Sequence, residues 1–130
     1  MGPSLITGIT GQDGTYLAEQ LVADGREVMG VVRGPGQPEL PAGVELLEGD
    51  LLDPAAMRRA IVEAAPAEVF HLAAPAFVPD SWKRPAETLA AIATGTAAVL
   101  EAARESDARV LVTGSAQVFA FADELVPAQA

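Results

Sequence analysis

A glycine-rich turn near the start of the chain constrains the fold more than any other feature. Gly8, Gly11 and Gly14 follow a short apolar stretch at residues 4–7 and lead into an amphipathic segment at residues 15–24. Glycine at the first position permits a tight turn out of a strand, and glycine at the third lets a helix pack closely on the sheet. The pattern predicts a strand, a tight turn and a helix in direct succession.

The rest of the chain repeats this alternation. Short apolar runs predict further strands at residues 27–33, 44–47, 68–72 and 109–113. A second helix is expected from Asp53 to Pro66, because Asp53-Pro54 is a favourable N-cap and first-turn pair. Strands and helices that alternate with right-handed crossovers predict an α/β fold. We expect a Rossmann-type, doubly wound parallel sheet of five strands in the order 3-2-1-4-5, in one domain at residues 1–130.

The longest expected helix runs over residues 85–106. Its apolar face is predicted from residues that recur at helical spacing, namely Leu89, Ile92, Ala93, Thr96, Val99, Leu100 and Ala103. In the second helix, Met57 and Ile61 are expected to face inwards. Phe77 and Trp82, between the fourth strand and the long helix, are interpreted first as packing residues and second as substrate contacts.

Composition narrows the classes of partner. The formal net charge is −10, which argues against nucleic acid and anionic membranes as partners, because both require basic patches. The chain has no cysteine, so neither disulfides nor thiolate chemistry contribute, and we expect no metal site. No export signal or membrane span is apparent, and we expect a cytoplasmic protein.

The glycine turn predicts a bound dinucleotide. A helix N-terminus offers unpaired N–H groups and a positive dipole end to phosphates, and glycine lets the backbone approach a pyrophosphate. The turn residues expected to contact the cofactor are Gly8, Thr10, Gly11, Gln12, Asp13 and Gly14. The alternative is that these glycines serve only a tight turn. The position between strand and helix favours the cofactor.

The end of the second strand bears on which dinucleotide is bound. NAD-binding domains usually place an acid there to accept a hydrogen bond from the ribose 2′-hydroxyl. Here the strand ends in Arg33, whose planar guanidinium suits a 2′-phosphate. We therefore favour NADP over NAD as the cofactor. The alternative is that Arg33 is only a solvated residue at the end of a strand and binds no phosphate. Asp50 is a candidate to accept a hydrogen bond from the adenine amino group, or else is a simple loop acid.

These motifs together resemble the extended short-chain dehydrogenase/reductase family of NAD-dependent epimerases and dehydratases. Within it, the segment from Thr7 to Glu19 is similar to GDP-mannose 4,6-dehydratases, as are Gly49-Asp50-Leu51 and His71-Leu72-Ala73-Ala74. Further similarity lies in Gly95-Thr96 and in residues 114–119, and residues 77–79 resemble equally the related GDP-4-keto-6-deoxymannose reductases. The resemblance covers essentially the whole chain, but only the N-terminal part of that fold.

The resemblance implies roles for particular residues. Ser115 matches the family's catalytic serine or threonine, whose hydroxyl orients the substrate oxygen. Ala73 and Ala74 match backbone that lines the cofactor after the fourth strand, and Leu51 and Leu72 are also expected to contact the cofactor. The resemblance also implies a nucleotide-sugar substrate for a full-length form, and a homo-oligomer. His71, the single histidine, is interpreted instead as a hydrogen-bonded core residue, because it lies on a buried strand.

The departures from the family pattern leave two interpretations open. Members carry Tyr-x-x-x-Lys further along, whereas this chain has only Tyr16 and Lys83, which do not form that pair. Gln117 replaces a catalytic glutamate, Ile92 an asparagine and Phe119 a tyrosine. The chain is therefore either the cofactor-binding piece of an enzyme, ending before the Tyr-x-x-x-Lys motif and the substrate domain, or a non-catalytic binding or scaffold module. In either case we expect no turnover by this chain alone. A third interpretation, an excised domain, would expose apolar surface on the fifth strand and the long helix and predicts self-association.

Overall fold

The computed structural model describes residues 2–34, 36 and 39–115, in which strands and helices alternate as the sequence predicts. The strands are β1 (Ser4–Thr7), β2 (Val28–Val32), β3 (Glu45–Glu48), β4 (Glu68–His71) and β5 (Arg109–Val112). The helical elements are α1 (Gln12–Ala23), α2 (Pro54–Ala64), α3 (Val78–Lys83), α4 (Pro85–Leu89), the π-helical segment η1 (Ala90–Thr94) and α5 (Gly95–Glu105).

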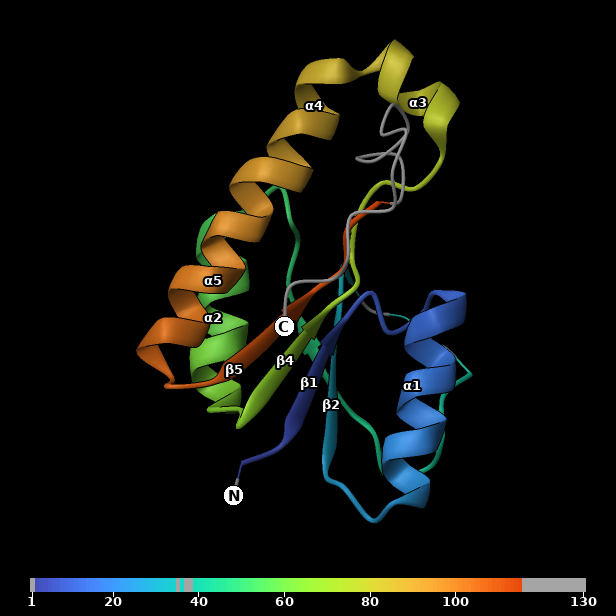
Figure 1. Ribbon diagram of the computed structural model, residues 1–130, viewed down its shortest axis with the longest axis vertical. Helices are drawn as coiled ribbons and strands as arrows, with labels where there is room; N and C mark the ends of the chain where they lie inside the picture. The colour runs from blue at the N-terminus through green and yellow to red at the C-terminus, as the bar shows by residue number, and fades with distance from the viewer. Residues whose placement is uncertain (1, 35, 37–38, 116–130) are drawn as a thin grey trace, which may run out of the picture.

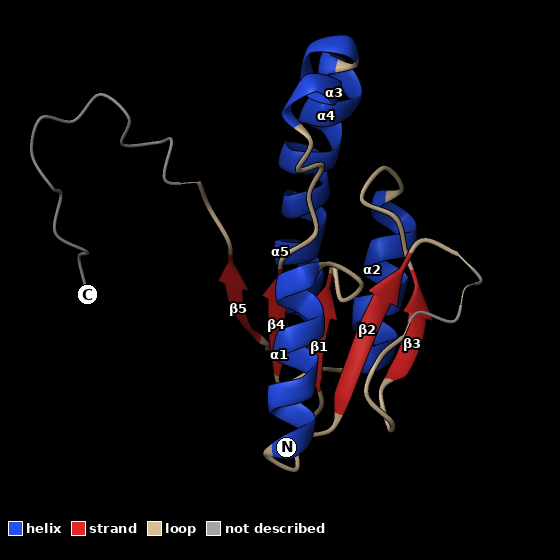
Figure 2. Ribbon diagram, turned by 90° about the vertical axis from the view of Figure 1, so that its right-hand side faces the viewer, coloured by secondary structure: helices blue, strands red, loops and turns tan. Residues whose placement is uncertain are grey.

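The five strands form one parallel sheet in the order β3-β2-β1-β4-β5, which confirms the predicted topology. Helix α1 covers one face of the sheet, and α2 and α5 lie together on the other (Figure 1). Above the carboxyl edge of the strands, α3 and α4 project beyond the sheet (Figure 2). Among the described helices, none is both long enough and apolar enough to cross a bilayer.

A hydrophobic core lies on each face of the sheet, because successive strand residues point to opposite sides. Leu5 packs with Met57, Ile61 and Val99 beneath α2 and α5, which confirms the inward face predicted for α2. Ile6 belongs to the second core, beneath α1. Every residue of β1 is buried, as expected for the central strand of a sheet covered on both faces.

Helix α1 begins three residues earlier than expected, at Gln12 instead of Thr15. The second half of the glycine turn is therefore the first turn of the helix. Gly14 permits this because its α-carbon lies against the preceding loop, where a β-carbon would come within 2.2 Å of the Gly8 carbonyl oxygen. Helix α2 follows the prediction, with the Asp53 side chain accepting a hydrogen bond from Ala56 N–H at 3.0 Å, but it ends at Ala64 instead of Pro66.

The long helix differs most from the prediction. It is interrupted by η1, and its buried residues are small, namely Ala91, Gly95, Val99, Ala102 and Ala103. The inward orientation predicted for Val99 and Ala103 is confirmed. Leu89, Ile92, Ala93 and Leu100 are exposed, so the inward orientation predicted for them is wrong. Small residues face inwards because the helix approaches its neighbours closely: a β-carbon on Gly95 would lie 3.0 Å from the Leu51 side chain.

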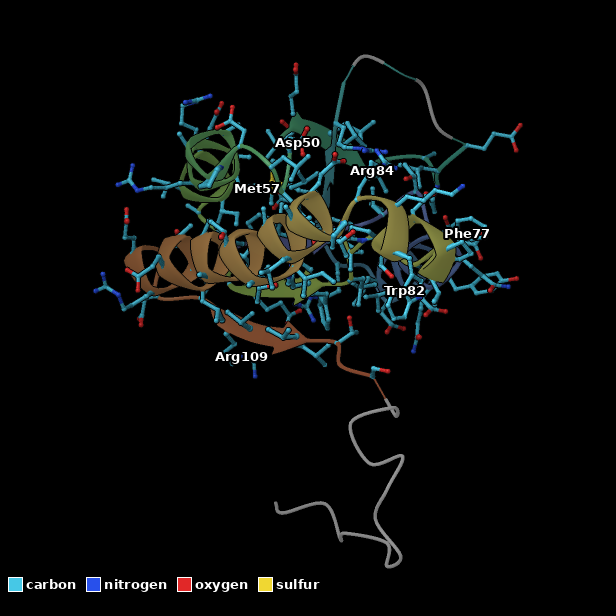
Figure 3. The ribbon with its side chains drawn as sticks, turned by 90° about the horizontal axis from the view of Figure 1, so that it is seen from above. Asp50, Met57, Phe77, Trp82, Arg84 and Arg109 are labelled. Carbon is cyan, nitrogen blue, oxygen red and sulfur yellow. The ribbon has the colours of Figure 1, made fainter. Side chains whose placement is uncertain are left out.

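The segment between β4 and the long helix also departs from the prediction. It contains a short helix, α3, for which the sequence offers no apolar periodicity. Trp82 and Phe77 are strongly exposed, so their interpretation as packing residues is wrong. Figure 3 shows both side chains beside α3, outside the two cores.

Candidate functional site

A cleft of about 1110 Å³ opens at the carboxyl edge of the sheet. It lies beside β1, which has β2 on one side and β4 on the other. The chain leaves β1 towards the face covered by α1, and it leaves β4 towards the face covered by α5. In doubly wound sheets this topological switch point is where ligands bind. Figure 3 looks onto this edge and shows Asp50 towards the α2 side and Phe77 towards α3.

The glycine turn forms the floor of the cleft. Gly8 has a φ of +74°, a conformation that favours glycine, and its carbonyl oxygen accepts a hydrogen bond from Gly11 N–H at 3.0 Å. A β-carbon on Gly8 would lie 2.8 Å from Ala73 N. The turn therefore depends on glycine both for its backbone conformation and for its contact with the loop after β4.

The N-terminus of α1 points its free amides at the cleft. Gly11 is the N-cap residue and has no side chain with which to satisfy the first-turn N–H groups. Thr15 secures the turn from the helix side, because its hydroxyl donates to the Gly11 carbonyl at 2.8 Å and its N–H to the same oxygen at 2.9 Å. Gln12 and Asp13 line the cleft at this end. Such a helix end binds anions readily.

The loop after β4 forms the opposite wall. Leu72 N–H donates to the Thr7 carbonyl at 3.2 Å, and Ala73 N–H donates to Thr7 Oγ1, also at 3.2 Å. These bonds continue the pairing of β1 with β4 beyond the strands themselves. Leu72, Ala73 and Ala74 consequently present backbone to the cleft directly beside the glycine turn.

His71 lies beneath this wall, and the interpretation of it as a satisfied core histidine is confirmed. The residue is only 3% exposed. Its Nδ1 lies 2.7 Å from Thr7 Oγ1 and its Nε2 lies 3.0 Å from Thr96 Oγ1. Burial lowers the pKa of His71, because the charged imidazolium loses hydration in the interior.

The ends of β2 and β3 close the third side. Arg33 follows β2 directly, is exposed and lines the cleft. Asp50 follows β3 and also lines the cleft, and its Oδ1 accepts a hydrogen bond from Leu52 N–H at 2.9 Å, which fixes the loop. Leu51 lines the cleft and packs against Gly95 of α5.

Apart from Phe77, whose second interpretation is a substrate contact, sequence reasoning missed the rim above these walls. Phe77, Asp80, Arg84, Thr88 and Ala91 line the cleft from α3, α4 and η1 and the residues beside them. The Arg84 guanidinium lies 3.5 Å from Asp80 and 3.2 Å from Glu87, so the rim is braced by ion pairs. Helix α3 has only six residues, which is too short for an apolar periodicity that would predict where these side chains lie.

The cleft thus brings together every position predicted to contact a cofactor. These are Gly8, Thr10, Gly11, Gln12, Asp13, Gly14, Arg33, Asp50, Leu51, Leu72, Ala73 and Ala74. Thr113 and Gly114 also line it, and Ser115 follows them as an exposed residue. Gln117 and Phe119 lie outside the described residues. Tyr16 and Lys83 lie on separate helices, α1 and α3.

Comparison with known proteins agrees with this architecture. A GDP-mannose 4,6-dehydratase of Vibrio cholerae is 39% identical over 114 residues, which cover 78% of this chain and 31% of the relative. The Bordetella bronchiseptica enzyme WbmG in complex with NAD is 32% identical with a TM-score of 0.77, covering 91% of this chain and 39% of that one. A Thermus thermophilus UDP-glucose 4-epimerase in complex with NAD is 32% identical with a TM-score of 0.72, covering 81% and 34%.

The chain accordingly spans about a third of the length of the curated relatives it matches. The family described as GDP-mannose 4,6 dehydratase matches residues 5–127, which include all of the cleft walls described above. The chain therefore belongs to the GDP-mannose 4,6-dehydratase family.

Proposed function

We propose that this chain holds a nicotinamide dinucleotide in the cleft, with the pyrophosphate against the glycine turn. The observation that carries the proposal is the meeting of three backbone features: the Gly8–Gly14 turn, the free first-turn amides of α1 and the Ala73 loop. The two structures compared above contain NAD on the same fold. A pyrophosphate on a helix N-terminus after β1 is the binding mode typical of this architecture.

The shape and size of the site fit such a ligand. Side chains on Gly8 or Gly14 would run into backbone atoms, so the floor consists of bare backbone that can approach a phosphate closely. The cleft volume of about 1110 Å³ slightly exceeds the usual range of about 300–1,000 Å³ for small-molecule sites, which leaves room for an extended dinucleotide. When bound, the nicotinamide would supply an acceptor and donor of hydride.

Within this proposal, NADP(H) is the favoured cofactor and NAD(H) the alternative. Arg33 is an exposed cation at the end of β2, and the strand and its exit, residues 28–34, contain no carboxylate to accept a hydrogen bond from a ribose 2′-hydroxyl. A guanidinium binds a phosphate through two parallel hydrogen bonds, which distinguishes NADP from NAD. Asp50, on the neighbouring strand end, is the proposed acceptor for the adenine amino group.

Titration with the reduced dinucleotides tests both parts of the proposal. The fluorescence of NADPH and NADH should change saturably on binding, and NADPH should bind about 10- to 100-fold more tightly, the range for hydrogen bonds to a charged group. Arg33→Ala should remove that preference and leave NADH binding unchanged. Arg104→Ala, at an exposed arginine on α5, is the matched control and should bind as the unaltered chain does.

Two outcomes would contradict these proposals in different ways. Absence of saturable binding by either dinucleotide would remove the cofactor function. Binding of NADH as tight as that of NADPH, unaffected by Arg33→Ala, would leave a dinucleotide site but overturn its specificity for NADP(H).

For a longer protein containing this domain, we propose modification of a nucleotide sugar. Ser115 would hydrogen-bond to the substrate oxygen at the carbon that exchanges hydride, which holds that carbon in place. This chain alone should not turn over GDP-mannose, because Tyr16 and Lys83, its single tyrosine and lysine, lie on different helices. Product analysis by chromatography checks this, and Ser115→Ala should leave the dinucleotide dissociation constant unchanged.

A non-catalytic binding or pairing module is the second candidate. Ile92 stands where the family has an asparagine, and its side chain is exposed on η1. An exposed isoleucine suits a contact with another chain better than a role in chemistry. Mixing this chain with a full-length homologue distinguishes the candidates, because a pairing module should form a mixed complex detectable by size.

A further inference from the structure

His71 joins three elements that wall the cleft, although it does not itself line it. One ring nitrogen contacts Thr7 at the end of β1, and the other contacts Thr96 on α5, while the residue itself ends β4. A buried imidazole hydrogen-bonded at both nitrogens is held in a single orientation. The ring therefore links β4 to β1 and to α5.

Hydrogen-bond geometry indicates which tautomer is present. Thr7 Oγ1 already accepts a hydrogen bond from Ala73 N–H, so its own proton is available to His71 Nδ1 at 2.7 Å. Nε2 then carries the ring proton and donates it to Thr96 Oγ1 at 3.0 Å. In the opposite tautomer Thr7 Oγ1 would accept two hydrogen bonds, and its proton would need another acceptor.

Each partner of the ring is coupled to a different wall of the cleft. Thr7 immediately precedes Gly8, and the Ala73 amide that it holds lies against the Gly8 α-carbon. Thr96 immediately follows Gly95, which packs on Leu51. A change at the ring would therefore move the glycine turn, the Ala73 loop and the Leu51 loop relative to one another.

We propose that His71 is a positioning residue for the dinucleotide: its neutral ring, protonated at Nε2, sets the separation of the glycine turn from the Ala73 and Leu51 walls. This inference rests on the proposed cofactor function of the cleft. His71 acts through Thr7 and Thr96 and does not touch the ligand. The side chains that contact the ring from β1 and α5 are the hydroxyls of Thr7 and Thr96, and the hydroxyl of Thr113, just after β5, donates to the His71 carbonyl. None of these three groups titrates near neutral pH.

Substitution of Thr96 tests the proposal, because Thr96 does not line the cleft. Thr96→Val keeps the shape of the side chain and removes the acceptor for Nε2–H. The NADPH dissociation constant should rise roughly 3- to 10-fold, the effect of losing one neutral hydrogen bond. Thr96→Ser, which restores the hydroxyl, should bind as the unaltered chain does. Thr94→Val, at an exposed threonine two residues away, is the matched control.

The ring itself can be observed directly in the unaltered chain. Because His71 is the single histidine, its ring gives the single pair of imidazole signals in ¹⁵N NMR, and couplings to the ring C–H protons distinguish Nε2 from Nδ1. At pH 7 we expect Nε2 to be protonated and Nδ1 not, with or without NADPH. In Thr96→Val this preference should weaken. A purely structural role would lower thermal stability without changing the affinity of the folded protein for NADPH.

The outcomes separate this inference from the function on which it rests. If the unaltered chain binds neither dinucleotide, both fall together. If it binds NADPH and Thr96→Val binds equally well, the positioning role alone is overturned. A ring protonated at Nδ1 in the unaltered chain would likewise overturn the inference while leaving the cofactor site intact.

Discussion

At the scale of single residues, Gly14 shows how strongly the candidate site depends on the absence of a side chain. Alanine in place of glycine within a helix is ordinarily stabilising by about 1 kcal/mol. At Gly14 the new β-carbon would lie 2.2 Å from the Gly8 carbonyl oxygen and 2.7 Å from Ile9 Cα. Both are backbone atoms, so the turn or the helix must shift to relieve the clash.

Gly14→Ala should therefore lower the melting temperature and abolish measurable dinucleotide binding. The destabilisation should be about 1–3 kcal/mol, the usual cost of overpacking in a close-packed interior. Denaturant unfolding gives the free-energy change. Gly34→Ala is the control for stability, because a β-carbon there meets no atom within 4 Å. A Gly14→Ala protein as stable as the unaltered chain would contradict the tight helix–turn packing.

Asp13 is a carboxylate in the first turn of α1, and its charge opposes the phosphates proposed to lie there. An acid at this position stabilises the helix through its dipole, by about 0.3–1 kcal/mol. Asp13→Asn should consequently lower stability slightly but tighten dinucleotide binding about 2- to 5-fold, because repulsion by one nearby charge is removed. Titration at low and high salt checks the cause, since screening should narrow the difference. Weaker binding by Asp13→Asn would contradict a phosphate at this turn.

At the scale of elements, Glu68 at the start of β4 links the amino ends of the strands. It accepts a hydrogen bond from the Ser4 hydroxyl at 2.8 Å and pairs with Arg26 and Arg109. The Ser4 hydrogen bond, together with the two guanidinium groups, lowers the pKa of Glu68 below its usual value of 4.5, against the opposing effect of burial. The folded state thus favours the carboxylate.

The sign of the pH dependence follows from this lowered pKa. The stabilisation is fully present above about pH 4.5, the unfolded value, and is lost as the pH falls through the lower folded value. Glu68→Gln should cost about 2 kcal/mol at pH 7 and flatten the decline of stability in acid. Urea unfolding between about pH 3 and 7 measures this. Glu105→Gln, in a more exposed pair with Arg58, is the control and should change stability less. An equal effect of both substitutions would contradict a special role for Glu68.

The elements also show what could be predicted from the sequence and what could not. The strands and the sheet order follow from local apolar runs and from the handedness of crossovers, and both are confirmed. The predicted face of the long helix is confirmed at Val99 and Ala103, which are fully buried. It is wrong at the larger residues, because burial along this helix depends on close approach to α2 and Leu51. That approach selects alanine and glycine over Leu89 and Leu100.

The same distinction holds within the site. The glycine turn and the ends of the strands could be predicted because parallel strands bring their carboxyl ends to one edge. The rim residues Asp80 and Arg84, and the Thr7–His71–Thr96 contacts, arise from tertiary packing between distant segments. No spacing rule in the sequence connects a threonine at position 7 with one at position 96.

At the scale of the whole molecule, several apolar side chains around β5 and the long helix belong to neither core of the described residues. Leu89, Ile92 and Leu100 are exposed on the helix, and Leu111 and Val112 on β5, an edge strand of the sheet. Exposed apolar surface of this kind beside an open strand edge favours association. The net charge of −10 opposes it through long-range repulsion. These opposing terms make association sensitive to salt.

We therefore predict that the chain forms homo-oligomers at micromolar concentration, more strongly at high salt, where repulsion is screened. Sedimentation velocity over a range of concentrations measures this. Leu100→Glu should shift the distribution of oligomeric states towards monomer, because it places a charge on the helix that carries the exposed Leu89 and Ile92. Val62→Glu, at an exposed apolar residue of α2, is the matched control and should leave the distribution unchanged. A monomer at every concentration and salt would contradict the prediction, because repulsion that is screened at high salt could not account for it. Equal dissociation by both substitutions would place the contact elsewhere.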